Sequence, residues 1–214
     1  MANSVEAVVA LLQMGVIEMH PWGSRAPHLD RPDRLIFDFD PDEALDYEPL
    51  VEGVTVLRKL LDTLELEAFL KTTGGKGVHV VVPIEPTRTW DDAKEFCRAV
   101  ADMIVKAFPD RYTASMAKAR RPGRIFIDYL RNVEGATAVA AYSVRAKARA
   151  PVSMPIDWSE LSHDVRFDRF NVKNVPEIVA KRKRDPWARM PRVRQALTDE
   201  MLARVGAKVP STRR

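Results

Sequence analysis

The segment Arg34-Leu-Ile-Phe-Asp-Phe-Asp-Pro41 constrains the fold more than any other part of the chain. Its acidic and apolar residues alternate with the period of a β-strand, so Phe37 and Phe39 face a core while Asp38 and Asp40 share the opposite face. Two like charges at this spacing repel each other, and a cation between them removes that cost. Oxygen ligands select a hard ion such as Mg²⁺ or Mn²⁺. The alternative is a strand end whose acids are simply solvated before the following turn.

The composition indicates a globular protein. With 214 residues, of which 46% are hydrophobic and 30% charged, the chain is long enough for one α/β domain with a sizeable core. No apolar run reaches the roughly 18 residues that cross a bilayer, and no secretion signal opens the sequence. Cys97 is the only cysteine, which excludes intrachain disulfides and thiolate metal sites. These features predict a reducing, cytoplasmic location.

Basic residues are concentrated near the C-terminus. The net charge of the whole chain is +4, but residues 181–214 contain eleven Lys or Arg against three Asp or Glu, a net charge of +8. Such a segment suits the phosphate backbone of a nucleic acid, although a solvated helical surface has the same composition. We therefore divide the chain into a core at 1–185 and a basic helical tail at 186–214.

Hydrophobic periodicity predicts interspersed strands and helices. A capping box of Asn3 and Glu6 opens a first helix that ends near Met14. Further helices are expected at 49–64, 89–108, 174–183 and 192–205, strands at 16–20, 34–40, 67–72, 78–84, 124–130 and 136–143, and a linker at 151–155. Because a strict βαβ alternation is absent, the pattern favours an α+β fold with a mixed, largely antiparallel sheet flanked by helices.

A second strand repeats the pattern of apolar residues followed by an acid. This strand is Arg124-Ile-Phe-Ile-Asp128. If it lies beside the first, Asp128 completes a cluster of three carboxylates with Asp38 and Asp40. Such a cluster can hold two divalent ions about 4 Å apart, the arrangement used in phosphoryl transfer. Taken alone, an acid at the end of a strand is unremarkable.

The glycine-rich segment Lys71-Thr-Thr-Gly-Gly-Lys-Gly-Val-His79 is a second candidate site. Its glycines allow backbone N–H groups to approach an anion in a tight turn. Thr73 adds a hydroxyl, Lys76 adds a positive charge, and His79 lies on the following strand; the turn glycines are Gly74, Gly75 and Gly77. The spacing is not that of a Walker loop, and a strand follows instead of a helix. The alternative is a plain hairpin with a surface lysine and a half-buried histidine.

Four further residues are weaker candidates. His20 stands in a His-Pro-Trp sequence and is equally compatible with a helix cap or a core histidine. Arg131, one turn beyond Asp128, suits either a carboxylate partner or a phosphate ligand. Arg145 and Lys147 share one face of an expected strand and form a basic stripe, which is equally compatible with a solvent-facing surface.

Taken in order, these motifs resemble a known family. His-Pro-Trp at 20–22, the Asp-Phe-Asp-Pro strand at 38–41, the glycine hairpin, Asp-Tyr-Leu-Arg-Asn at 128–132 and Tyr-Ser-Val-Arg-Ala at 142–146 are similar to the polymerase domain of bacterial ATP-dependent DNA ligase D, a member of the archaeo-eukaryotic primase superfamily. The resemblance extends over about residues 8–185. It implies a palm-like sheet and a template-directed nucleotidyltransferase that extends or fills DNA ends in nonhomologous end joining.

The resemblance also implies cofactors, partners and residue roles. Asp38, Asp40 and Asp128 match the catalytic metal motifs, so two Mn²⁺ or Mg²⁺ ions are expected. Thr73 and His79 match the motif that holds the nucleotide triphosphate, and His20, Arg131 and Arg145 match other active-site positions. The implied substrates are nucleoside triphosphates, with ribonucleotides preferred, and DNA ends with a 5′-phosphate or gaps. A separate ligase and the end-binding Ku protein are implied partners, and the implied location is the nucleoid.

Three departures from the family pattern leave other interpretations open. Thr73 stands where serine is frequent, and Lys147 where arginine is common, which removes bidentate phosphate geometry. Family members carry a further N-terminal stretch before the first helix, which we expect this chain to lack. The chain is then alternatively an inactive, truncated remnant that binds DNA or nucleotide. A weaker alternative is an aspartate-nucleophile phosphatase, because its fold also opens with an apolar strand and Asp-x-Asp.

Overall fold

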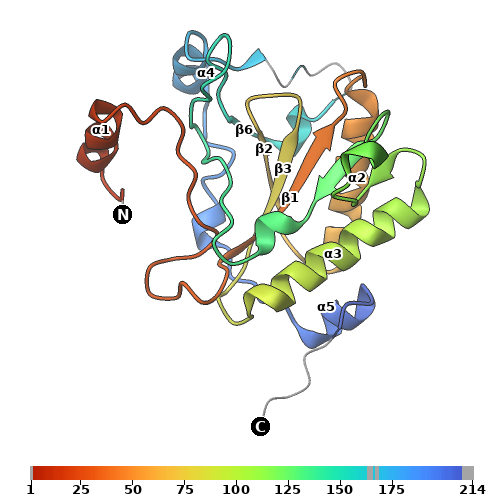
Figure 1. Cartoon of the computed structure of the whole chain (residues 1–214). Coiled ribbons are helices and arrows are strands. Elements are labelled where there is room, and N and C mark those ends of the chain that lie inside the picture. The colour runs from red at the N-terminus through yellow and green to blue at the C-terminus, as the bar shows by residue number, and fades with distance from the viewer. Residues whose placement is uncertain (1, 163–165, 167–168, 209–214) are drawn as a thin grey trace.

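The computed structural model describes residues 2–162, 166 and 169–208, and a six-stranded sheet lies at its centre (Figure 1). The strand order is β4-β5-β1-β3-β2-β6, and all neighbouring pairs are antiparallel except β4 and β5. The strands are β1 (Arg34–Pro41), β2 (Phe69–Thr72), β3 (Val78–Pro83), β4 (Tyr112–Thr113), β5 (Ile125–Asp128) and β6 (Pro155–Ile156). The predicted mixed, largely antiparallel sheet is confirmed.

The position of β1 bears on the phosphatase alternative. This strand lies inside the sheet with antiparallel neighbours on both sides, β3 and β5. A Rossmann-like sheet, which an aspartate-nucleophile phosphatase requires, is built from parallel strands joined by crossover helices. The topology therefore excludes the phosphatase interpretation.

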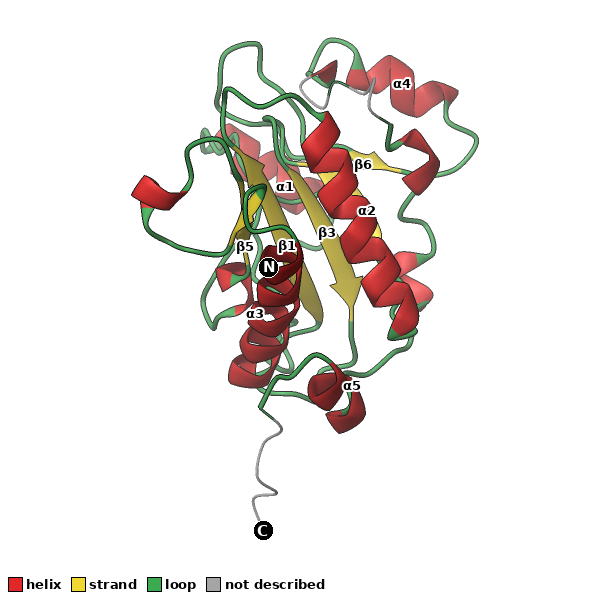
Figure 2. Ribbon diagram, turned by 90° about the vertical axis from the view of Figure 1, so that its right-hand side faces the viewer, coloured by secondary structure: helices red, strands yellow, loops and turns green. Residues whose placement is uncertain are grey.

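Two long helices cover one face of the sheet. Helix α2 (Glu48–Thr63) and helix α3 (Trp90–Ala107) lie side by side against it (Figure 2). Thr89 and Asp92 form the capping box that begins α3, since each side chain accepts a hydrogen bond from the other residue's backbone. The buried residues of α2 and α3 pack against the odd-numbered residues of β1 in one apolar core. Both predicted helices are confirmed.

The first helix differs from the prediction. Helix α1 (Val5–Gln13) is capped by Ser4, whose hydroxyl accepts from the Ala7 backbone N–H, and not by Asn3. The prediction failed because Asn3 and Ser4 are both good caps and the choice depends on the backbone conformation. No residue of α1 is buried, and in Figure 1 the helix stands apart from the sheet.

The C-terminal part contains less helix than predicted. Helix α4 (Val175–Lys181) is shorter than the expected 174–183, and of the expected helix at 192–205 only α5 (Asp199–Arg204) forms a regular α-helix. Thr198 caps α5, and the extended residues before it carry Leu197 into the main core. Leu202 also lies in that core, so part of the predicted tail packs on the body.

Three other segments also differ from the prediction. Residues 16–20 do not form a strand, because they are joined to 138–140 by few backbone hydrogen bonds and Pro21 has no N–H to donate. The strand expected at 136–143 is a loop with isolated bridges, and Tyr142 has a positive φ there. The linker expected at 151–155 instead contains buried Val152, Ser153 and Met154, and it leads into β6 at the edge of β2.

Among the described residues, no helix has the length and apolar character needed to cross a membrane.

Candidate active site

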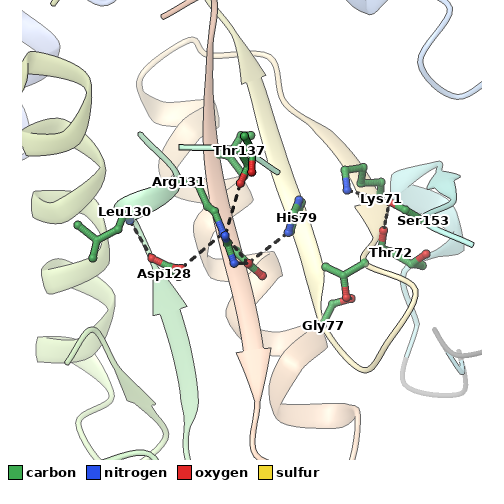
Figure 3. Close-up of polar contacts among 12 residues, drawn as sticks. Lys71, Thr72, Gly77, His79, Asp128, Leu130, Arg131, Thr137 and Ser153 are labelled. Carbon is green, nitrogen blue, oxygen red and sulfur yellow. Dashed lines mark hydrogen bonds and ion pairs between the residues drawn. The ribbon is translucent and has the colours of Figure 1, made fainter. Parts of the chain in front are cut away.

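A row of four ionisable residues crosses the sheet on the face opposite α2 and α3. In register, Asp128 of β5 lies across from Asp38 of β1, Asp38 lies across from His79 of β3, and His79 lies across from Lys71 of β2. Directly opposite residues of paired strands project to the same face, so these four side chains share one face of the sheet; Figure 3 labels Asp128, His79 and Lys71 of this row. The structure thus places the third predicted acid beside the first two and on the same face.

Asp38 is the most enclosed acid of this row, with 7% of its surface exposed. Burial alone would raise its pKa, but the His79 imidazole and the Arg131 and Lys71 cations hold the pKa at about 2. One carboxylate oxygen, Oδ2, lies 3.3 Å from His79 Nε2 and 3.1 Å from Arg131 Nη2. Asp38 therefore carries a negative charge at neutral pH and is surrounded by positive or neutral donors.

Asp40 and Asp128 flank Asp38 and show the opposite shift. Desolvation, followed by the negative charge of Asp38, raises the pKa of Asp40. Desolvation also raises the pKa of Asp128, although its Oδ1 accepts a 2.8 Å hydrogen bond from the Leu130 backbone N–H. Three carboxylates on one face thus repel each other, which is the condition that a divalent cation relieves.

The Arg131 guanidinium lies between two of these acids (Figure 3). Its Nε is 3.2 Å from Asp38 Oδ2 and 3.5 Å from Asp128 Oδ2. Within the described part of the chain, no three His, Cys, Asp or Glu side chains are arranged as they stand to hold a metal ion. The donor set itself, three carboxylates without a soft ligand, fits a hard divalent ion, and Arg131 is the cation that approaches it here.

His79 has one nitrogen without a partner. Its Nε2 faces Asp38, while its buried Nδ1 has no hydrogen-bond partner. Burial and the nearby Lys71 charge lower its pKa, so the ring is neutral at neutral pH. A carboxylate only accepts hydrogen bonds, so Nε2 carries the proton and Nδ1 presents a lone pair. A buried polar atom left unpaired in this way is costly, and it marks a position where a ligand can be bound.

The turn between β2 and β3 is closed by Thr73. Both the backbone N–H and the hydroxyl of Thr73 donate to the Gly77 carbonyl, each at 3.1 Å. Gly74 has a φ of +73°, and a Cβ at Gly77 would lie 2.6 Å from the Phe39 carbonyl oxygen. The two glycines are thus required by a left-handed backbone and by the close approach of β1, which brings the turn to the end of the acidic strand.

The remaining predicted residues surround this turn. Arg145 donates from Nη1 to the Thr73 carbonyl at 2.5 Å, and Lys147 Nζ lies 3.5 Å from where a Cβ of Gly75 would be. Lys76 donates to the Glu43 carbonyl, in the segment that follows β1. His20 lies beyond Arg145, its Nε2 donating to Glu18 at 2.7 Å. Arg145 and Lys147 therefore lie at the turn. His20 is linked to the turn only through Glu18 and Arg145. Lys76 joins the turn to the segment after β1.

Several residues of this region were missed in the sequence. Lys71 is 2% exposed, and its Nζ donates to Ser153 Oγ at 2.8 Å. Burial lowers the pKa of Lys71 to about 7. Glu18 binds both His20 and Arg145, and Arg121 stacks 3.7 Å from the centre of the Phe126 ring. A lysine inside a four-residue apolar strand was the available signal for Lys71, and none singled out the other two.

One cavity lies beside the site and not over the acids. It has a volume of about 1040 Å³, and Glu18, His20 and Trp22 are among its lining residues. Most of its other lining residues are apolar and come from the 16–29 segment, and α1 contributes Leu11. It opens next to the His20 end of the site.

Comparisons with known proteins place the chain among related sequences. The family model described as LigD, primase-polymerase domain matches residues 1–187. The multifunctional non-homologous end joining protein LigD of Pseudomonas aeruginosa is 41% identical over 205 residues, which is 95% of this chain and 24% of that protein. The LigD protein of Mycolicibacterium smegmatis is 31% identical over 172 residues, which is 79% of this chain and 23% of that protein.

A solved structure shares the fold. The polymerase domain of Mycobacterium tuberculosis ligase D in complex with DNA superposes with a TM-score of 0.77 at 27% identity, over 84% of this chain and 65% of that one. This chain spans about a quarter of the length of the LigD proteins it matches. The family model covers most of the chain, and the solved domain has a similar fold. The chain belongs to the LigD primase-polymerase domain family.

Proposed function

We propose that the chain is a metal-dependent nucleotidyltransferase that extends or fills DNA ends in nonhomologous end joining, with ribonucleotides as its preferred substrates. The observation that carries the proposal is the register of Asp128, Asp38 and His79 on one face of the sheet, beside the glycine turn. This arrangement places carboxylates next to groups that suit a polyphosphate. For this chain, the activity of the full-length LigD proteins is a proposal.

The proposed metal ligands are Asp38, Asp40 and Asp128. Bound Mn²⁺ or Mg²⁺ would neutralise the triphosphate and favour the attacking 3′-hydroxylate. The chain's own contribution is to hold three carboxylates together, at a cost that the raised pKa values of Asp40 and Asp128 record. Arg131 must give up part of its contact with Asp38 and Asp128 when a divalent ion takes its place, so it acts as a resident counter-charge.

The proposed triphosphate ligands lie around the glycine turn. A polyphosphate near His79 would raise the pKa of that ring, and Nδ1 would then carry a proton to donate to a phosphate oxygen. The Thr73 hydroxyl donates to Gly77 at present and would have to turn to bind phosphate. Arg145 has five N–H donors, of which those to Glu18 and Thr73 are engaged, so it can add a contact without leaving its position.

The DNA partner is proposed from the comparison and from charge. The solved relative is a polymerase domain in complex with DNA. In this chain Arg184 and Arg189 are 78% and 77% exposed, and they belong to the basic C-terminal region. Exposed arginines of this kind suit a phosphate backbone. A separate ligase and the Ku protein are proposed partners on the basis of family membership alone.

Primer extension tests the proposal. The full chain with Mn²⁺ should extend a primer on a gapped duplex with a 5′-phosphate, faster with ribonucleotides than with deoxyribonucleotides. Asp38→Ala and Asp128→Ala should abolish extension, while Asp62→Ala, an exposed acid of α2, should not. Full extension by the Asp38 and Asp128 variants would contradict the proposal.

A second candidate function is DNA or nucleotide binding without catalysis. It is favoured by one observation, that the described acids are paired with Arg131 and His79 instead of being arranged around an ion. This alternative requires salt-sensitive DNA binding, no extension with Mn²⁺ or Mg²⁺, and no effect of Asp38→Ala on binding. Extension by the wild-type chain would exclude it.

A further inference from the structure

Glu18 lies where three segments of the chain meet. It stands in the stretch between α1 and Pro21, and its carboxylate accepts three hydrogen bonds from groups close to the proposed nucleotide site. The donors are His20 Nε2 at 2.7 Å, Arg145 Nε at 3.0 Å and the Ala146 backbone N–H at 2.7 Å. Both oxygens of the carboxylate are used, Oε2 by the two side chains and Oε1 by the backbone.

The charge of Glu18 is secured by these donors. The hydrogen bonds from His20 and from the Ala146 N–H, with a smaller contribution from Arg145, lower the pKa of Glu18 to about 2, although burial acts in the opposite direction. The side chain is only 25% exposed. Charge-assisted hydrogen bonds of this type are stronger than neutral ones, so the cluster fixes the side chains that take part.

Arg145 carries the effect of Glu18 to the glycine turn. Its Nε is held by Glu18, and its Nη1 donates to the Thr73 carbonyl at 2.5 Å. The Arg145 Cγ lies over Gly74, since a Cβ added there would come within 2.6 Å of it. The guanidinium is therefore fixed at both ends, by a carboxylate 127 residues away and by the backbone of the turn.

Glu18 also determines which nitrogen of His20 carries a proton. A carboxylate can only accept, so the His20 nitrogen that faces it, Nε2, must be protonated. In the neutral ring this leaves Nδ1 as an acceptor. Without Glu18 nothing among the described contacts of His20 would select this tautomer.

We infer that Glu18 is a positioning residue of the nucleotide site, which holds Arg145 against the Gly74–Gly77 turn and fixes the tautomer of His20. The inference rests on the proposed function, because it assigns a role within the same site. It predicts that the loss of Glu18 weakens nucleotide binding without affecting the binding of DNA, since no part of its contact set involves the exposed basic residues near the C-terminus.

Glu18→Gln is the sharpest variant. The amide has the same shape, but it offers one accepting oxygen and one donating NH₂ group to a site where all three partners are donors. The NH₂ group then faces either the Ala146 N–H or the two side-chain donors, so the contact that holds Arg145 Nε is weakened in either orientation. The control is Glu160→Gln, because Glu160 has an equivalent set of partners far from the turn, accepting from the Asp157 backbone N–H at 2.8 Å and from Arg182 at 3.1 Å.

The experiment measures nucleotide and DNA separately. Calorimetric titration of the full chain with Mn²⁺ and an α,β-methylene ATP, which cannot be turned over, should show a loss of affinity of about 10-fold or more in Glu18→Gln. The KM for the nucleotide in primer extension should rise in parallel. DNA affinity measured by fluorescence anisotropy should stay within about twofold, and Glu160→Gln should match the wild type in nucleotide affinity and in KM.

A metal-free measurement tests the same inference independently. In ¹⁵N spectra of the nucleotide-free protein, His20 should be in the Nε2–H tautomer when neutral, and Glu18→Gln should give a mixture. If Glu18→Gln fails to fold, Glu18→Asp keeps the charge but shortens the side chain, and the same loss of nucleotide affinity is expected.

The possible failures are distinguishable. Wild-type chain that neither binds the nucleotide analogue nor extends a primer would overturn the proposed function. Active wild type with unchanged nucleotide affinity in Glu18→Gln, or an equal loss in Glu160→Gln, would overturn only the role of Glu18. A wild-type His20 in the Nδ1–H tautomer would also overturn it.

Discussion

The two faces of the central sheet are built from the same strands and behave in opposite ways. On one face, Phe37 and Phe39 of β1 are completely buried against α2 and α3. On the other, Asp38 of the same strand meets Asp128 and His79 across its neighbours. Because side chains alternate along a strand, one segment supplies both the core and the site. Residues that stabilise the core and residues of the candidate site therefore alternate along one strand.

The two faces differ in what their side chains require from their surroundings. Apolar side chains need only close packing, which the helices provide. The charged face holds an acid at a pKa of about 2, two acids with raised pKa values and a buried histidine nitrogen without a partner. Such a face persists only because the packed face supports it.

The largest effect on stability is expected from the apolar face. Phe37→Ala removes a fully buried ring and leaves a cavity between β1 and the helices. Its free energy of unfolding should fall by about 3–5 kcal/mol, measured by urea denaturation. Val179→Ala, at a residue of α4 that is 43% exposed, should change it little. Equal effects of the two substitutions would mean that this face is not the core.

On the charged face, a substitution should reduce activity and leave stability intact. Asp128→Asn keeps the acceptor for the Leu130 N–H but removes a carboxylate that burial and Asp38 disfavour. Primer extension should fall at least about 100-fold, a typical cost of removing one electrostatic group from an active site. The free energy of unfolding at pH 7 should stay the same or rise. A large loss of stability with activity retained would reverse the assignment of the two faces.

The sequence predicted the apolar face better than the charged one. The alternation of β1 and the helical periodicity of residues 89–108 are local patterns, and the strand and α3 follow them closely. The same alternation placed Asp38 and Asp40 on one face. Asp128 required the further assumption that its strand is a neighbour, which the register bears out.

The residues that were missed depend on contacts between distant segments. Lys71 joins the row only because β2 pairs with β3 in one particular register, and Glu18 matters only because residues 145 and 146 fold back to it. The two-residue strands β4 and β6 are likewise defined by their partners rather than by their own sequence. Local propensity carries no signal for such pairings.

The turn between β2 and β3 contacts the end of β1, and Gly77→Ala tests this contact. A Cβ at Gly77 would lie 2.6 Å from the Phe39 carbonyl, so β1 or the turn must move. The free energy of unfolding should fall by about 1–3 kcal/mol in urea denaturation, and nucleotide affinity should fall with it. In Gly75→Ala the nearest atom is Lys147 Nζ at 3.5 Å, an ordinary contact, so its stability should change less. Equal stability of the two variants would show that the turn does not depend on its contact with β1.

The smallest effect concerns the cost of burying Lys71. Burial lowers its pKa to about 7 from an ordinary value of 10.5. Between these pH values the unfolded chain binds a proton that the folded chain does not, so the wild-type free energy of unfolding should rise with pH. Below pH 7 both states are protonated and the full penalty is present. Lys71→Met removes this penalty, while Ser153 keeps its hydrogen bond to the Thr72 carbonyl.

Urea denaturation in EDTA from pH 6 to pH 10.5 measures this cost. Lys71→Met should be more stable than the wild type by about 1 kcal/mol at pH 6, and the difference should shrink as the pH rises, because a buried charge is replaced by an apolar side chain of similar length. Comparing the two proteins at each pH cancels the titration of Cys97 and the tyrosines. Lys59→Met, at an exposed position of α2, should show no such trend. A difference that grows with pH would mean that the Lys71 ammonium stabilises the charged face, and that this face is satisfied without a ligand.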